Sequence, residues 1–83
     1  MNVNFYTTAG CHLCEEALVL LRALQEQGQD PGRPLQITEI DIADSEALLT
    51  LYDVRIPVIT SDSSTGELGW PFSAEELSRF LKL

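Results

Sequence analysis

The stretch that decides the fold is residues 3–16, which read VNFYTTAGCHLCEE. Apolar Val3 and Phe5 alternate with asparagines, and this period of two is typical of a strand. Residues 7–10 break the alternation. Beyond them, apolar residues recur at helical spacing, at Leu13, Ala17, Leu20, Leu21 and Leu24. The stretch therefore predicts a strand, a short turn and a long helix, with two cysteines at the junction.

Downstream, predicted helices and strands continue to alternate. Two glycines and two prolines between Gly28 and Pro34 predict a loop after the first helix. Beyond this loop we expect a second strand over residues 35–42, a short helix capped by Asp44 that carries Ala47, Leu48, Leu51 and Tyr52, a third strand opening at residues 56–59, and a fourth over residues 67–70.

The last predicted helix has the clearest start. Ser73 and Glu76 have the spacing of a capping box, in which each side chain accepts a backbone N–H from the other residue. Phe72 precedes the box and Leu77 follows it, a pair suited to a hydrophobic staple. The predicted element order is therefore β-α-β-α-β-β-α.

The length of the chain limits it to one domain, residues 1–83, because a second hydrophobic core would not fit. Hydrophobic residues make up 45% of the chain and charged residues 22%, a balance that favours a folded domain over disorder. Helices that alternate with strands predict an α/β fold, in which a helical crossover makes the first two strands parallel neighbours.

The charge of the chain restricts its partners. Five Lys and Arg residues face 13 Asp and Glu residues, for a net charge of −8, which repels nucleic acid and anionic membranes. The longest apolar run, Ala17–Leu21, is far below the roughly 20 residues of a membrane span. Met1–Asn4 lacks the features of a signal peptide. We therefore expect a cytoplasmic monomer, in a compartment that keeps thiols reduced.

Cys11 and Cys14 form a C-x-x-C motif at the predicted strand-to-helix junction. A helix start has unpaired N–H groups and a partial positive charge, and both favour a thiolate and lower the pKa of a cysteine. Cys11 is therefore predicted to attack a disulfide, and Cys14, one turn later, to resolve the mixed disulfide. His12, when protonated, adds positive charge, whereas Glu15 and Glu16 oppose a second anion.

Two other interpretations of the cysteines stay open. Structural zinc usually takes four protein ligands, and the chain offers two cysteines and one histidine, which lies between them. No metal site within one chain is therefore predicted, and a metal or cluster shared by two chains is the alternative. The other alternative is a pair of half-buried thiols without chemistry.

Four segments resemble the glutaredoxin-like proteins, a branch of the thioredoxin superfamily. Residues 5–16 resemble the active-site segment of that family, and residues 39–42 resemble its second strand. Residues 54–58 resemble its proline loop, and residues 67–72 its closing segment. The match covers nearly the whole chain in the right order.

This resemblance implies a thioredoxin-like fold, a four-stranded mixed sheet flanked by three helices. It implies that the Ile56–Pro57 bond is cis and lies against the cysteine pair. It also implies that Ile56 offers backbone groups to an extended substrate, as in strand addition. Cys11 would be the nucleophile and Cys14 the resolving thiol.

His12 and Arg55 complete the predicted substrate-binding set with Ile56 and Pro57. Arg55 suits a carboxylate such as that of glutathione, and its alternative role is a surface pair with a nearby acid. The chain has Asp53 where the family often has Gly, and it has no Lys shortly before the cysteines. Because features that help bind glutathione are missing, glutathione is only one candidate co-substrate, beside a dithiol protein. No resident cofactor is expected.

The predicted function is that of a thiol–disulfide oxidoreductase, which reduces or exchanges protein or mixed disulfides through Cys11 and Cys14. Its partner would be a disulfide-bearing protein or a small thiol. The alternatives are a glutathione-assisted metal or iron–sulfur binding module and a redox-inactive interaction protein of the same fold.

Overall fold

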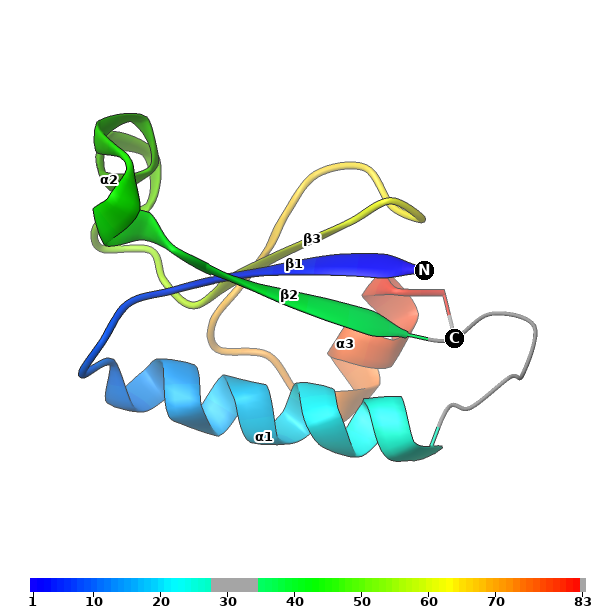
Figure 1. Ribbon diagram of the computed structural model, residues 1–83. Coiled ribbons are helices and arrows are strands. Elements are labelled where there is room, and N and C mark those ends of the chain that lie inside the picture. The colour runs from blue at the N-terminus through cyan, green and yellow to red at the C-terminus, as the bar shows by residue number, and fades with distance from the viewer. Residues whose placement is uncertain (28–34, 83) are drawn as a thin grey trace.

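The computed structural model describes residues 1–27 and 35–82 (Figure 1). The predicted loop Gly28–Pro34 lies outside the described residues. The elements are β1 (Asn2–Thr7), α1 (His12–Gln27), β2 (Gln36–Asp41), a 3-10 turn (Ile42–Asp44), α2 (Glu46–Tyr52), β3 (Val58–Ser61), β4 (Leu68–Gly69) and α3 (Ala74–Phe80). This order confirms the predicted β-α-β-α-β-β-α arrangement.

The strands form one mixed sheet in the order β2-β1-β3-β4. β1 and β2 are parallel neighbours, as predicted, and their register pairs Phe5 with Glu39. β3 runs antiparallel to β1, and the two-residue β4 runs antiparallel to β3. β1 is thus a central strand, with β2 on one side and β3 on the other, and the turn that carries Cys11 follows its end.

The main core lies between the sheet and the helices α1 and α3, which cover the same face (Figure 1). β1 contributes Val3 and Phe5 to this core, and both side chains are fully buried. The helices contribute Cys14, Ala17 and Leu21 from α1, and Leu77 and Leu81 from α3 and its end. A fully buried leucine contributes about 1.5–3 kcal/mol relative to an exposed one, so this layer holds the sheet to its helices.

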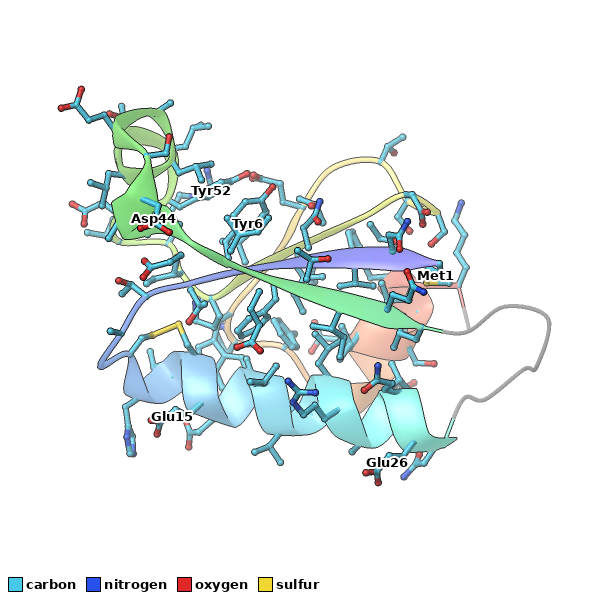
Figure 2. All side chains as sticks on the ribbon, viewed as in Figure 1. Met1, Tyr6, Glu15, Glu26, Asp44 and Tyr52 are labelled. Carbon is cyan, nitrogen blue, oxygen red and sulfur yellow. A yellow bond between two sulfur atoms is a disulfide. The ribbon has the colours of Figure 1, made fainter. Side chains whose placement is uncertain are left out.

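A smaller cluster packs α2 on the opposite face of the sheet. Ile42, Tyr52 and Val58 are its buried members, and Tyr6 packs against them. The rings of Tyr6 and Tyr52 lie 4.6 Å apart, centre to centre (Figure 2). These contacts hold the end of α2 against β1 and β3.

Helix caps explain two of the helix starts. Ser73 and Glu76 form the predicted capping box, with both reciprocal hydrogen bonds. The prediction of Asp44 as the cap of α2 was wrong, because Ser45 holds that position and its hydroxyl accepts the N–H of Leu48. Asp44 instead ends the 3-10 turn that precedes the helix.

The predicted apolar face of α1 was wrong in the first turn of the helix. Leu13 is 48% exposed, although its spacing fits the predicted stripe. Cys14, Ala17 and Leu21 are the buried positions instead, with Cys14 2% exposed. In the part of the chain that the structure describes, no helix is both long and apolar enough to cross a membrane.

Candidate active site

A disulfide joins Cys11 and Cys14 at the start of α1, with 5.2 Å between their Cα atoms. The yellow bond lies between the end of β1 and the first turn of the helix (Figure 2). Gly10, with φ of +78°, makes the turn that leads into the helix, a conformation that L side chains rarely adopt. The predicted junction therefore carries both cysteines.

The Cys11 sulfur accepts a hydrogen bond from the first turn of α1. The backbone N–H of Cys14 donates to Cys11 Sγ at 3.1 Å. The N–H of Glu15 donates to the carbonyl of Cys11 at 3.3 Å. Because the Cys14 N–H lies in the first turn of the helix, where N–H groups lack a backbone partner, it is a donor already in place to stabilise an anion at Cys11 Sγ.

The two sulfurs differ in access. Cys14 is 2% exposed and belongs to the main core cluster, whereas Cys11 is half-buried at the edge of that cluster. An incoming molecule can therefore reach Cys11 and not Cys14. This asymmetry fits an attacking and a resolving sulfur.

His12 extends into solvent from the first turn of α1. Its side chain is 89% exposed, and its Nδ1 lies 3.6 Å from the carboxylate of Glu15. The two side chains thus face each other on the outer surface of the helix. A role of His12 in substrate binding stays a prediction.

Arg55 is part of a compact polar cluster with Tyr52 and Glu67. Its guanidinium donates to the Glu67 carboxylate and lies over the Tyr52 ring, with 5.3 Å from Cζ to the ring centre. The Tyr52 hydroxyl also donates to Glu67, and together these donors hold the pKa of Glu67 below its ordinary value. The same hydrogen bond, with a smaller effect of burial, raises the pKa of Tyr52 to about 12. The structure thus places Arg55 in a pair with an acid.

The Ile56–Pro57 peptide bond is cis, and Pro57 is fully buried. Ile56 is half-buried and packs against both core clusters. Its N–H donates to the Tyr52 carbonyl at 3.2 Å, so pairing with an extended substrate would fall to its carbonyl. Substrate binding by Ile56 and Pro57 stays a prediction.

A cavity of about 190 Å³ opens beside the disulfide. Both cysteines contribute to its wall, together with Phe5, residues 7–10, Glu15, Leu18 and Glu39. Glu39 and Glu67 are the site residues that the sequence-based prediction missed. Glu39 did leave a signal, because it is the polar residue that interrupts the apolar pattern of the predicted second strand.

Within residues 1–27 and 35–82, no group of three or more His, Cys, Asp or Glu side chains is placed to hold a metal ion. The chemistry that the described residues offer at this place is that of the cysteine pair.

The lowered pKa of Glu67 predicts how the domain responds to acid. Ionised Glu67 stabilises the folded state above the pKa it has when unfolded, and this contribution disappears as pH falls through the lowered pKa of the folded state. We therefore expect wild type to exceed Glu67→Gln in free energy of unfolding at pH 7, and the difference to shrink below about pH 4.5. Urea unfolding at several pH values measures it.

The control for this prediction is Glu75→Gln. Glu75 pairs with Arg79 at 3.0 Å on the open surface of α3, where an ion pair contributes little. We expect Glu75→Gln to unfold like wild type at every pH. A gap between wild type and Glu67→Gln that widens in acid would contradict the prediction.

Comparison with known proteins places this geometry in a family. The Glutaredoxin-like domain (DUF836) profile matches residues 2–82. The X-ray structure of Northeast Structural Genomics target protein XcR50 from X. campestris is 30% identical, with a TM-score of 0.75 over 96% of this chain and 95% of that chain. Its solution structure is 32% identical, with a TM-score of 0.74 over 99% and 94%.

A more distant likeness concerns the fold. Thioredoxin 1 from Thermosipho africanus is 14% identical, with a TM-score of 0.65 over 99% of this chain and 96% of that chain. No curated protein matches the chain. The family profile matches nearly all residues of the chain, and the sheet order and the cysteine pair agree with that match. The chain therefore belongs to the glutaredoxin-like domain family of thioredoxin-fold proteins.

Proposed function

We propose that the protein is a thiol–disulfide oxidoreductase that works through Cys11 and Cys14. The observation that supports this most strongly is the hydrogen bond from the Cys14 N–H to Cys11 Sγ at 3.1 Å. It provides a donor for a thiolate at the accessible sulfur, and the thiolate is the reactive form of a cysteine. Cys14, which is buried next to Cys11, supplies the second thiol.

The reaction transfers two electrons from the protein to the substrate. The Cys11 thiolate attacks one sulfur of a substrate disulfide, the substrate S–S bond breaks, and one substrate thiolate leaves. Cys14, as a thiolate, then attacks Cys11 Sγ and releases the second substrate thiolate. The two protons of the cysteine thiols end on the two departing thiols, and Cys11–Cys14 becomes the disulfide seen in the structure.

The proposed substrate is a protein disulfide or the mixed disulfide of a small thiol. Glutathione or a dithiol protein would return the pair to the reduced form, and the protein would act as a monomer in the reducing cytoplasm. Its net charge of −8 argues against nucleic acid or an anionic membrane as partner. Substrate-binding roles of His12, Arg55, Ile56 and Pro57 belong to this proposal.

A redox titration of the Cys11–Cys14 pair tests the proposal. The protein is equilibrated in parallel glutathione and dithiol buffers, the thiols are alkylated, and the masses are measured. We expect one two-electron transition between about −320 and −120 mV, the range of thioredoxin-fold proteins and cellular thiol buffers. A mixed disulfide that accumulates only in the glutathione buffer would identify glutathione as a reaction partner. Cysteines that stay in one state over this range would favour the interaction protein.

A further inference from the structure

The cavity beside the disulfide combines an apolar wall with a negative rim. Phe5 and Leu18 supply the apolar wall, whereas Glu15 and Glu39 supply carboxylates from α1 and β2. None of the residues that line the cavity carries a positive charge. Because both cysteines form part of the same wall, any group attached to Cys11 through a mixed disulfide has this cavity as its immediate surroundings.

Glu39 occupies an unusual place in the sheet. It pairs in register with Phe5, and Phe5 is 1% exposed on the face that α1 covers. The Glu39 side chain is 48% exposed and lies 3.2 Å from Arg22, which belongs to α1 and does not line the cavity. A carboxylate thus stands at the edge of a face that is otherwise used for the core.

The described arginines are already paired with glutamates, and none of them lines the cavity. Each of the three arginines that the structure describes, Arg22, Arg55 and Arg79, has a glutamate partner. Arg55 is the one that directly precedes Ile56 and Pro57, and Glu67 holds its guanidinium. A carboxylate on a substrate would have to displace Glu67 to reach Arg55.

We infer that the site selects disulfides that carry a positive charge close to sulfur and disfavours those that carry carboxylates, with Glu39 and Glu67 as the two determinants. The inference rests on the proposed function. Glu39 would attract the cation at the rim of the cavity, where the cation would compete with Arg22 for the exposed Glu39 carboxylate. Glu67 would keep Arg55 from binding an anion.

The chemistry of such a substrate follows from the wall of the cavity. A short methylene chain between the sulfur and the cation can lie against Phe5 and Leu18, while the cation stays hydrated at the rim. A lysine or arginine next to a substrate cysteine has this character, and so does an aminoalkyl disulfide. The Cys11 thiolate forms a bond to one substrate sulfur, and the other substrate sulfur leaves as a thiolate. The charged group takes no part in the electron balance.

Three small disulfides of similar length test the inference: cystamine, which is cationic, bis(2-hydroxyethyl) disulfide, which is neutral, and 3,3′-dithiodipropionate, which is anionic. The reduced protein is mixed with each in turn, and the loss of its thiols is followed by alkylation and mass spectrometry. Each rate is divided by the rate of the same disulfide with free dithiothreitol. The ionic strength is about 0.15 M, where charges beyond about 8 Å are largely screened.

We expect the corrected rate to fall from cystamine to the neutral compound and then to dithiodipropionate, by about fivefold to tenfold in total. Glu39→Gln should lower the rate with cystamine by about threefold, because it removes the carboxylate at the cavity. Glu67→Gln should raise the rate with dithiodipropionate by about threefold, because it releases Arg55.

The matched control is Glu75→Gln. It changes the net charge by the same amount and also releases an arginine, Arg79, but Glu75 lies on α3 and does not line the cavity. We expect the ratios of the three rates to stay those of wild type. Unfolding curves of the variants confirm that each is folded.

Two results would overturn the inference. One is an equal corrected rate for all three disulfides, and the other is a change with Glu75→Gln as large as with Glu39→Gln, which would assign the preference to the net charge. The proposed function fails separately, if none of the three disulfides oxidises the Cys11–Cys14 pair. Uniform rates through Cys11 would leave that function intact.

Discussion

Cys11→Ser should abolish disulfide exchange, with a loss of about a thousandfold or more in rate. A serine hydroxyl stays protonated at neutral pH, so it cannot provide the anion that attacks the substrate sulfur. The hydrogen-bond donor at this position, the Cys14 N–H, would remain in place but would have no thiolate to stabilise. The measurement is the rate of reduction of a mixed-disulfide substrate, with an external dithiol in excess.

Cys14→Ala is the informative partner of this variant. Alanine suits a position that is 2% exposed, because it buries no unpaired hydroxyl there. Cys11 can still attack in this variant, but no second thiol releases the product. We therefore expect a stable mixed disulfide at Cys11, visible as a mass increase that dithiothreitol removes.

The pair of variants separates the possible roles. A mixed disulfide that forms on Cys11→Ser and not on Cys14→Ala would reverse the assignment of attacking and resolving sulfur. Full activity in Cys11→Ser would end the proposal of a cysteine-based enzyme. Both outcomes are distinct from misfolding, which the circular dichroism spectrum of each variant reveals.

The parts of the fold that the sequence predicted well depend on local information. The change from alternating to helical spacing lies within residues 3–16, so it located the cysteine pair at the end of β1. The Ser73 and Glu76 capping box also needs only four consecutive residues. The parallel pairing of β1 with β2 followed from the helical crossover that connects them.

The errors arose where local patterns allow two solutions. Asp44 and Ser45 are adjacent and both are good caps, and the 3-10 turn that ends at Asp44 decides between them. Leu13 fits the spacing of the apolar stripe, but Cys14 takes the core position in that turn. Cys14 can take this position because cysteine is among the most buried residue types, in addition to being reactive.

The electrostatic surroundings of the site depend on contacts between distant segments. Glu39 meets the cavity because β2 pairs with β1 in one register, and a shift by one residue would turn it to the other face. Glu67 meets Arg55 because β4 returns beside β3. Glu39 is 17 residues from its partner Arg22, and Glu67 is 12 residues from its partner Arg55. Spacing along the chain could therefore not predict either pair.

Leu21→Ala should cause the largest loss of stability among single core substitutions in α1. Leu21 is fully buried between the sheet and the helices, in the cluster that includes Phe5 and Leu77. Removing a buried leucine side chain costs about 2–5 kcal/mol, from lost burial and from the cavity left behind. For a domain of this size, each kcal/mol lowers Tm by roughly 4–8 °C, so we expect a decrease of at least about 8 °C.

Val19→Ala on the same helix is the control for this prediction. Its side chain is 68% exposed, and alanine has the higher helix propensity, so the free energy of unfolding should stay within about 0.5 kcal/mol of wild type or rise. Thermal and urea unfolding of both variants measure the difference. Equal effects of the two substitutions would contradict the packing of α1 on the sheet. Because Leu21 belongs to the same buried stripe of α1 as Cys14, Leu21→Ala should also make Cys14 more accessible to alkylation in the reduced protein, whereas Val19→Ala should not.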